Sequence, residues 1–459
     1  MSIVFHLPRR LSLLVLGVIG LAATPVRGDD WPQWLGPQRD GVWRETGILD
    51  KFPKGGPKVR WRVPTGGGYA GPAVANGKVF VADRVLAPGS KDPDNPFSRT
   101  NSEGVERVTC LDDATGDVVW RHTYPCKYGM SYPCGPRCTP VVAGGKVYSL
   151  GAMGDLYCLD AATGKVVWSK NFMKDYSAPL AVWGFAASPL LDGDKLICLV
   201  GGKASIVVAF DKDNGTEKWK ALSFEKGQTE LGYCPPMIYK VGGVRQLIIW
   251  HPEAVNSLDP ETGKVYWSEK FMLKANLAIP TPRLDGDKLL ISSFYNGSRL
   301  YKLDSEKPGA TQVWASRGAG EMPRLTDNLN CIMSTPFVRD GYIYGVCSYG
   351  ELRCLKLEDG SRVWQDMRAT GSQKEPNERW ANAFLVPQGD RWFLSNEKGD
   401  LIIAKLSPEG YEEIDRAHIL EPTSKITGRM VVWSHPAFAN RSMYMRNDKE
   451  IVCVSLAKE

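Results

Sequence analysis

One short stretch recurs along the chain and constrains its fold more than any other feature. Residues 156–168 read LYCLDAATGKVVW: an alternating apolar run, a turn with Asp160, Thr163 and Gly164, and a second run that ends in tryptophan. This pattern is typical of a β-hairpin, because the alternation matches the period of a strand and glycine permits a tight turn. Residues 108–120 and 255–267 repeat the pattern. The repetition indicates a fold built from equivalent units.

The tryptophans that end these hairpins recur with a period of 47 to 51 residues, at Trp120, Trp168, Trp219, Trp267, Trp314 and Trp364. Four short strands with their turns need about 40 to 50 residues, so the period predicts one propeller blade per repeat. A degenerate seventh copy, residues 401–414, places Ile414 in the tryptophan column. An eighth copy starts at Ile451 and lacks its last strand, which residues 58–61 (KVRW) could supply.

The sequence therefore predicts an all-β fold, an eight-bladed β-propeller of four-stranded blades that closes by pairing an N-terminal strand with the C-terminal blade. An open stack of blades is the alternative, but it would leave both terminal blades incomplete and their edges exposed. We expect a signal peptide at residues 1–28, an N-terminal segment at residues 29–57 and a single propeller at residues 58–459. A composition of 47 glycines and 31 prolines fits short strands and many turns.

The repeated residues have structural tasks in this interpretation. Each turn glycine supplies a positive φ angle, and each tryptophan is large enough to act as a wedge between blades. The turn glycines are Gly116, Gly164, Gly215, Gly263 and Gly360. Cysteines at one position of the hairpin, Cys110, Cys158, Cys354 and Cys453, are interpreted as small core residues.

The motif D-x-x-T-G-x-x-x-W, with Ala, Ser or Cys two residues before its Asp, resembles the repeat of propellers of the pyrroloquinoline quinone (PQQ) type. The full motif occupies residues 110–120, 158–168 and 257–267, and residues 31–41 (WPQWLGPQRDG) resemble the N-terminal segment of exported members. That family includes quinoprotein alcohol dehydrogenases and the BamB-type outer-membrane assembly factor. The resemblance implies the propeller fold from about residue 58 onward, and it implies two different functions.

The N-terminus predicts export. Arg9 and Arg10 precede an apolar run of about 13 residues, and small residues favour cleavage near Gly28 and Asp29, so we expect a periplasmic or extracellular protein. An uncleaved anchor is the alternative, although the run is shorter than the roughly 20 residues that span a bilayer. The formal net charge of +6 includes three arginines of residues 1–28, and no long basic run predicts nucleic-acid binding. We expect a monomer without an integral membrane span in the mature chain.

Three of the eleven cysteines, Cys126, Cys134 and Cys138, lie close together in the sequence. A disulfide bond among them is left open, as is the pairing of the other cysteines. A metal site is disfavoured because no histidine or further cysteine completes a recognised spacing.

The candidate binding residues precede the innermost strands, where propellers normally carry their ligand face. Proline recurs at the expected start of seven of these strands, and aromatic, arginine or asparagine side chains stand just before it. The binding candidates are Tyr69, Arg137, Trp183, Tyr233, Asn276, Asn330, Trp380, Asn382 and Trp433. Arg137 is the strongest candidate because a guanidinium suits a carboxylate or a partner's backbone, and a salt bridge to the neighbouring blade is the alternative. The polar insertion at residues 86–104 is expected to overhang one face, as a partner-binding or a disordered loop.

No catalytic residue and no metal ligand is predicted. The common hydrolase, zinc-protease, haem and P-loop motifs are absent, and His251 and His435, which each precede a proline, are interpreted as turn or channel residues. In the quinoprotein dehydrogenases the cofactor lies over two adjacent cysteines beside a Ca²⁺ bound by Glu, Asn and Asp. This sequence has no Cys-Cys pair, so PQQ and Ca²⁺ are implied by the resemblance only.

The leading hypothesis is a non-catalytic, exported propeller that acts as a protein-binding or assembly scaffold of the BamB type. The alternatives are a quinoprotein oxidoreductase that uses PQQ and Ca²⁺, and a carbohydrate-binding propeller. Whether the protein is an enzyme stays undecided at this level, with the missing motifs favouring a negative answer.

Overall fold

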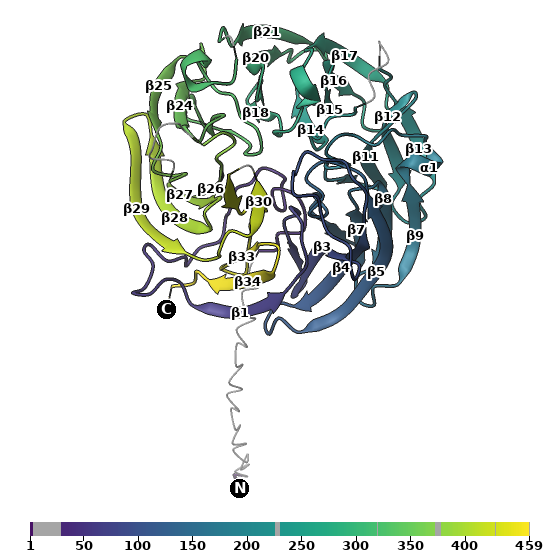
Figure 1. The fold of residues 1–459 in the computed structure, drawn as a ribbon. Coiled ribbons are helices and arrows are strands. Elements are labelled where there is room, and N and C mark those ends of the chain that lie inside the picture. Colours follow the sequence, from purple (N-terminus) through teal and green to yellow (C-terminus); the bar gives the residue numbers. More distant parts are fainter. Residues whose placement is uncertain (3–28, 225–229, 319, 372–377, 427, 459) are drawn as a thin grey trace.

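The fold is a ring of eight four-stranded antiparallel sheets, as Figure 1 shows. The computed structural model describes residues 1–2, 29–224, 230–318, 320–371, 378–426 and 428–458. The prediction of an eight-bladed propeller is confirmed, whereas the predicted signal peptide lies almost wholly outside the described residues.

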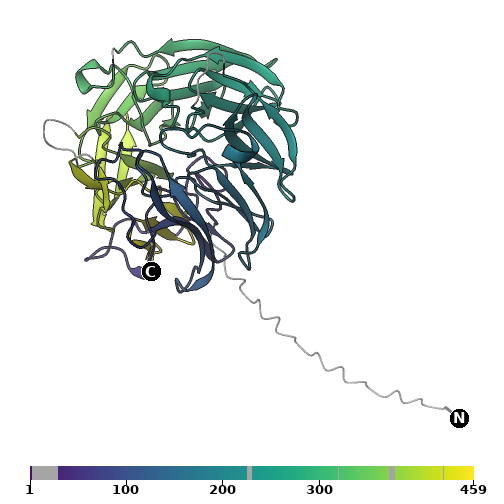
Figure 2. The same cartoon turned by 45° about the vertical axis from the view of Figure 1, so that its right-hand side comes forward.

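Each blade follows the chain from an inner to an outer strand, and Figure 2 shows the ring obliquely. Blades 1 to 4 contain β2 Ala73–Ala75, β3 Lys78–Leu86, β4 Ser102–Asp112, β5 Val118–Tyr128; β6 Val141–Ala143, β7 Lys146–Leu150, β8 Asp155–Asp160, β9 Val166–Asn171; β10 Leu190–Asp192, β11 Lys195–Gly202, β12 Ser205–Asp211, β13 Glu217–Ala221; β14 Met237–Val241, β15 Val244–His251, β16 Ala254–Leu258, β17 Val265–Lys270.

Blades 5 to 8 contain β18 Arg283–Asp285, β19 Lys288–Ser293, β20 Gly297–Leu303, β21 Ala310–Ala315; β22 Phe337–Arg339, β23 Tyr342–Val346, β24 Leu352–Lys356, β25 Arg362–Asp366; β26 Ala383–Gln388, β27 Arg391–Asn396, β28 Asp400–Ser407, β29 Gly410–His418; β32 Ala437–Ala439, β33 Ser442–Arg446, β34 Glu450–Ser455 and β1 Val59–Pro64. The connections carry a hairpin, β30 Ser424–Ile426 with β31 Arg429–Val431, and three short helices, α1 Phe172–Asp175, η1 Lys274–Asn276 and η2 Pro323–Leu325.

The ring closes through the strand nearest the N-terminus. Strand β1 pairs antiparallel with β34, and Trp61 stands opposite Cys453. Figure 1 shows the purple β1 beside the yellow C-terminal strands. Because β1 becomes the outer strand of blade 8, the predicted closure is confirmed and the last blade has its four strands.

Seven inner strands begin directly after a proline, which marks the end of the loop that leads into each of these strands. Proline tolerates this position because the first residue of a strand need not donate to the ladder. The pairs of proline and first strand residue are Pro72 and Ala73, Pro140 and Val141, Pro189 and Leu190, Pro236 and Met237, Pro282 and Arg283, Pro336 and Phe337, and Pro436 and Ala437. Blade 7 lacks this proline, and β26 begins after Asn382.

The tryptophans of the repeat join neighbouring blades. Trp120 of blade 1 donates its indole N–H to the carbonyl of Ala161 in the turn of blade 2 at 3.0 Å, and its ring packs against Gly164 of that turn. Trp61, Trp168, Trp219, Trp314 and Trp364 donate in the same way to the following blade. Trp267 departs from the pattern, because its indole bonds to Gln246 within blade 4.

Adding one methyl group at this contact is expected to destabilise the ring. A Cβ at Gly164 would lie 2.5 Å from Cε3 of Trp120, and the φ angle of this glycine is 71°. The control is Gly193, which has a φ of 59° but no atom within 4 Å of a Cβ. We expect Gly193→Ala to lower the free energy of unfolding by about 1 to 2 kcal/mol, and Gly164→Ala by about 1 to 3 kcal/mol more. Urea unfolding measures the free energy of unfolding of both variants. Equal losses would show that the contact between Trp120 and Gly164 does not stabilise the ring.

The strand register corrects one residue of the predicted tryptophan column. In blade 2 the bulge skips Val167, so that Trp168 pairs with Cys158. In blade 7 the bulge skips Ile414, and Asp415 pairs with Ile403. The column position therefore belongs to Asp415, and the prediction of Ile414 was wrong by one residue. The carboxylate of Asp415 accepts a hydrogen bond from the backbone N–H of Phe52 at 2.8 Å, so this position binds the N-terminal segment.

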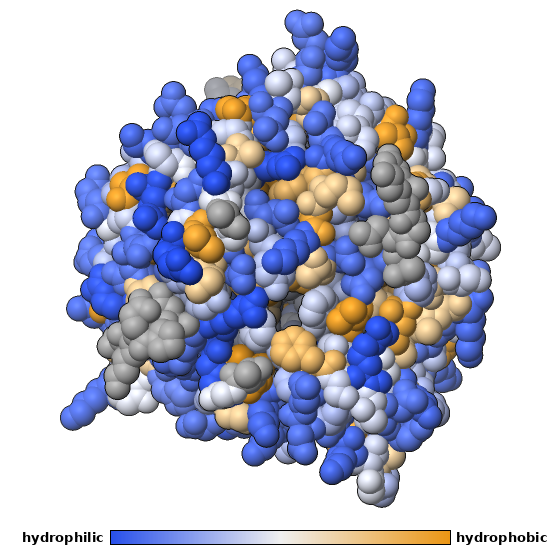
Figure 3. All heavy atoms as spheres, turned by 45° about the horizontal axis from the view of Figure 1, so that its top comes forward, coloured by the Kyte–Doolittle hydropathy of each residue, from blue (hydrophilic) through white to orange (hydrophobic). Residues whose placement is uncertain are grey.

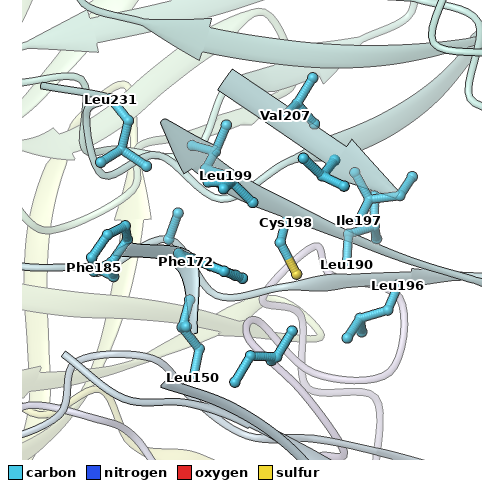
Figure 4. Packing of buried hydrophobic residues seen from close by; sticks show 14 of the residues in the cluster. Leu150, Phe172, Phe185, Leu190, Leu196, Ile197, Cys198, Leu199, Val207 and Leu231 are labelled. Atoms are coloured by element: carbon cyan, nitrogen blue, oxygen red, sulfur yellow. The ribbon is translucent and has the colours of Figure 1, made fainter. Parts of the chain in front are cut away.

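The hydrophobic core lies between successive blades. Figure 4 shows the cluster between blades 2 and 3, where Leu150, Phe172 and Phe185 face Leu196 and Cys198. The hairpin cysteines Cys110, Cys158, Cys354 and Cys453 are buried in such clusters, as predicted. All eleven cysteines are free thiols in the structure.

The N-terminal segment, residues 29–57, packs beneath the inner strands and closes the ring at one end. Arg39 donates to the carbonyls of Pro189 at 3.0 Å and Pro236 at 3.1 Å, which belong to blades 3 and 4. Trp43 packs against Phe438 of blade 8, with ring centroids 5.0 Å apart. The segment thereby bridges blades on opposite sides of the ring and leaves the other end open.

Candidate functional site

A cavity of about 600 Å³ lies on the ring axis, at the end of the molecule where the inner strands begin. Figure 3 shows apolar side chains gathered around a hollow near the middle of this largely hydrophilic face. The lining is dominated by rings, namely Trp34, Tyr69, Phe97, Tyr132, Trp183, Tyr233, Tyr295, Trp380, Phe384, Trp433 and His435. Arg99, Arg137 and Arg379 supply its positive charges. Such a mixture of apolar walls and a few polar groups is typical of a binding site.

Most of the predicted binding residues come together here. Tyr69, Arg137, Trp183, Tyr233, Trp380 and Trp433 line the cavity. The predicted asparagines do not. Asn330 is buried, and its side-chain amide donates to the carbonyl of Phe294 at 2.7 Å. Asn382 is also buried, and its backbone carbonyl accepts from the N–H of Glu397 at 3.1 Å. Asn276 lies in η1, whereas its neighbour Ala275 lines the cavity. The binding role of all these residues stays a prediction.

Arg137 is fixed by its own loop. Its guanidinium donates to the carbonyls of Gly135 at 2.8 Å, Ser131 at 3.0 Å and Tyr132 at 2.6 Å, and it lies 5.2 Å from the ring centre of Tyr69. It forms no ion pair with any residue that the structure describes. The alternative of a salt bridge to the neighbouring blade finds no support among the described residues, where the partners of this guanidinium are backbone carbonyls.

Hydrogen bonds behind the walls orient the aromatic rings. Trp433 donates its indole N–H to Glu397 at 2.9 Å, and Arg429 pairs with the same carboxylate at 2.7 Å. Tyr233 donates its hydroxyl to Glu230 at 3.0 Å, and its ring meets Trp183 edge to face. Burial raises the pKa of Glu397 and of Tyr233. The rings are thus held as a preformed surface.

The insertion between β3 and β4 borders the mouth of the cavity, as its predicted overhang implies. Phe97 packs edge to face on Tyr132 at 5.1 Å and lies 5.9 Å from Trp380 of the loop before blade 7. The carbonyl of Phe97 accepts from the hydroxyl of Ser131 at 2.9 Å. Residues of this loop that the structure describes therefore form part of the wall.

Several lining residues escaped the sequence-based prediction. Trp34 comes from the N-terminal segment and forms the floor, with its indole N–H bonded to Thr281 at 3.1 Å. Tyr295 comes from the loop between β19 and β20, and Arg379 from the loop before blade 7. The prediction considered only the residues shortly before each inner strand. The turn between the second and third strands of each blade reaches the same face as the loop before the inner strand. Inspection of these turns in the sequence could therefore have identified Tyr295.

His435 lines the cavity, in agreement with its interpretation as a channel residue. Its ring lies between Trp34 at 4.9 Å and Phe384 at 4.7 Å, and Nδ1 is 2.8 Å from the carbonyl of Pro436. Burial lowers the pKa of this imidazole from 6.5 to about 4. His251 is buried in blade 4 and does not line the cavity.

The low pKa of His435 predicts a loss of stability in mild acid. The unfolded chain binds a proton near pH 6.5 and the folded chain only near pH 4, so stability is complete above pH 6.5 and falls as the pH drops toward 4. Between pH 7 and pH 5 we expect a loss of about 2 kcal/mol from this group. Urea unfolding of the wild type and His435→Gln at both pH values measures it. If His435→Gln loses as much stability as the wild type between pH 7 and pH 5, the loss does not come from His435.

The cavity does not fit a quinone cofactor held with Ca²⁺ in the manner of the quinoprotein dehydrogenases. Its described lining includes no aspartate or glutamate. The part of the chain that the structure describes contains no group of three or more histidine, cysteine, aspartate or glutamate side chains that could hold a metal ion. The donor set for a hard cation is thus missing from these walls.

The fold is an eight-bladed propeller with a cavity on its axis. The chain belongs to a family of such propellers, because the model described as "Outer membrane protein assembly factor BamB" matches residues 104–366. No curated protein matches the sequence significantly. None of the described helices is both long and apolar enough to cross a membrane.

Solved structures share the fold at low sequence identity. BamB from Moraxella catarrhalis is 14% identical with a TM-score of 0.53, over 81% of this chain and 99% of that one. A europium-containing methanol dehydrogenase is 14% identical with a TM-score of 0.59, over 93% and 89%. The quinohemoprotein alcohol dehydrogenase from Comamonas testosteroni is 13% identical with a TM-score of 0.57, over 94% and 81%. Assembly factors and dehydrogenases are therefore both among the structural neighbours.

Proposed function

We propose that this protein is a non-catalytic, exported and monomeric binding scaffold whose axial cavity holds a segment of a partner protein. The observation that carries the proposal is the chemistry of the lining. Rings and arginines offer stacking surfaces and directed donors, whereas the described lining holds no carboxylate or thiol. Burial lowers the pKa of its single imidazole to about 4, which makes that imidazole a weak base. This set of groups can recognise a ligand, but it offers only a weak base and serine hydroxyls with no carboxylate among the lining residues to activate them.

The quinoprotein neighbours favour a second candidate, an oxidoreductase that uses PQQ and Ca²⁺. The shared fold supports that candidate, but the walls lack the donors that a Ca²⁺ site needs. A carbohydrate-binding propeller is less well supported. Sugar hydroxyls are commonly held by carboxylates and amides, and the described lining contains no Asp, Glu, Asn or Gln side chain.

A titration separates the first two candidates. Protein from residue 29 onward is titrated with PQQ and Ca²⁺ while tryptophan fluorescence and dye-linked alcohol oxidation are followed. Saturable quenching with turnover would contradict the scaffold proposal. The proposal predicts no turnover, together with retention of a partner protein by the wild type that is weakened by Arg137→Ala. Arg362→Ala is the matched control, because Arg362 is exposed on the outer strand β25 and bonds to Gln365.

A further inference from the structure

The cavity carries positive charge without matching negative charge. Arg379 pairs with Glu321 at 3.1 Å, and Arg99 and Arg137 have no carboxylate partner among the described residues. Glu230 is half-buried and is not among the lining residues, and its carboxylate accepts from the hydroxyl of Tyr233 and from the N–H of Val182. The surface that a ligand meets is therefore cationic.

The bonds of Arg137 hold its charge in place but do not neutralise it. Its three partners are backbone carbonyls, which orient the planar guanidinium, and its face lies against Tyr69. Arg99 bonds likewise to the carbonyls of Gly129 at 3.2 Å and Leu180 at 3.4 Å. Arg137 is half-buried, whereas Arg99 is exposed. A guanidinium with only neutral acceptors gains most from a carboxylate, because a charge-assisted hydrogen bond is about twice as strong as a neutral one.

Apolar side chains continue beyond the cavity, on the loops around its mouth. Phe97, Met272, Met322 and Met430 are exposed by 43%, 46%, 40% and 45%. They belong to the β3–β4 insertion, the loop before η1, the loop before η2 and strand β31, respectively. Each methionine is near a residue of the cavity wall. Met272 precedes Ala275 by three residues, Met322 follows Glu321, the partner of Arg379, and Met430 precedes Val431, which packs with Tyr132. Methionine is favoured on surfaces that adapt to a bound chain. A small molecule enclosed in about 600 Å³ would meet Phe97, which lines the cavity, but not the three methionines, which are not among the lining residues.

We infer that the occupant of the cavity is an acidic, aromatic stretch of a partner polypeptide, which places a carboxylate at Arg137 and Arg99 and a ring among Tyr69, Trp183 and Trp433. This inference rests on the proposed binding function. The carboxylate pairs with the positive charges of the two arginines, and the ring stacks on the aromatic walls. The flanking residues of the partner cover the methionines at the rim.

The test compares two peptides that differ in one charge. The first is an acetylated and amidated tripeptide of phenylalanine, aspartate and phenylalanine, and the second has asparagine in place of aspartate. Binding to the full chain is measured by calorimetry and tryptophan fluorescence at low and at physiological salt. We expect the aspartate peptide to bind about tenfold more tightly to the wild type. In the double variant Arg99→Gln and Arg137→Gln this preference should fall below about twofold, and Arg362→Gln should retain it.

The outcomes separate the inference from the function beneath it. Equal affinity of both peptides for the wild type would overturn the inference that the partner segment is acidic. A neutral segment could still bind, so the proposed scaffold function would remain intact. Absence of binding by both peptides would also overturn the inference. Naphthalene-2-carboxylate that binds as tightly as the aspartate peptide would assign the cavity to small organic acids. Turnover with PQQ and Ca²⁺ would instead overturn the scaffold function itself.

Discussion

Trp61→Ala is expected to lower the free energy of unfolding by about 3 to 5 kcal/mol, the range for removal of a large aromatic side chain from a core. Trp61 is 7% exposed, packs on Tyr444 and donates its indole N–H to the carbonyl of Asp113 at 2.7 Å. It therefore joins blade 8 to blade 1 at the closing strand. Its loss should also loosen β1, and hydrogen exchange should rise in β1 and β34 before the other strands.

The control is Val59→Ala in the same strand. Val59 is 44% exposed, and its truncation should cost about 0.5 kcal/mol or less. Urea unfolding monitored by far-UV circular dichroism measures both variants. Equal losses for Trp61→Ala and Val59→Ala, or uniform exchange across the ring, would show that the closing strand does not hold the ring together.

Trp43→Ala is expected to have a similarly large effect, about 3 to 5 kcal/mol, although it lies outside the repeats. Trp43 is 1% exposed, packs against Phe393 and Phe438, and donates to Glu45 at 2.8 Å. Its removal leaves a void beside Phe393 of blade 7 and Phe438 of blade 8. It also removes one donor from the carboxylate of Glu45, which keeps its bonds from the backbone N–H groups of Arg441 and Asp29. The N-terminal segment would then hold the floor of the cavity less firmly.

Arg44→Ala serves as the comparison for Trp43→Ala. Arg44 is the next residue and is exposed, and it forms a surface ion pair with Asp40. Such pairs contribute about 0 to 1 kcal/mol. If unfolding in urea shows no larger loss for Trp43→Ala than for Arg44→Ala, the segment is an appendage and not part of the core.

The repeated elements of the fold were predictable because each carries its own local signal. A turn glycine, an alternating run and a wedge tryptophan specify one hairpin without reference to the others, and the period of the tryptophans then specifies the blade. The misplacement of Ile414 arose where that signal is weak. In blade 7 the tryptophan is replaced by Asp415, and only the strand register, with its bulge at Ile414, identifies the replacement.

The cavity was predictable only in part. The six predicted residues that line the cavity all precede an inner strand closely, so the repeat itself places them on one face. Tyr69, Arg137, Tyr233 and Trp433 lie four residues before the strand, Trp380 three and Trp183 seven. Trp34 and Phe97 reach the cavity from segments outside the repeat, and no period predicts where such segments lie. Asn330 occupies a predicted position, yet its amide bonds to Phe294, a choice that depends on packing between blades.

Site-specific photo-cross-linking tests the central claim, that the axial cavity and its rim are the functional surface, most directly. The photoreactive amino acid p-benzoylphenylalanine replaces Phe97 at the cavity mouth, or Val363 on the outer strand β25, in cells that produce the full chain. Both positions are exposed, Phe97 by 43% and Val363 by 39%. The account predicts a discrete polypeptide adduct from position 97 that Arg137→Gln weakens, with none from position 363. Adducts from position 363 alone, or adducts from position 97 that are insensitive to Arg137→Gln, would contradict it.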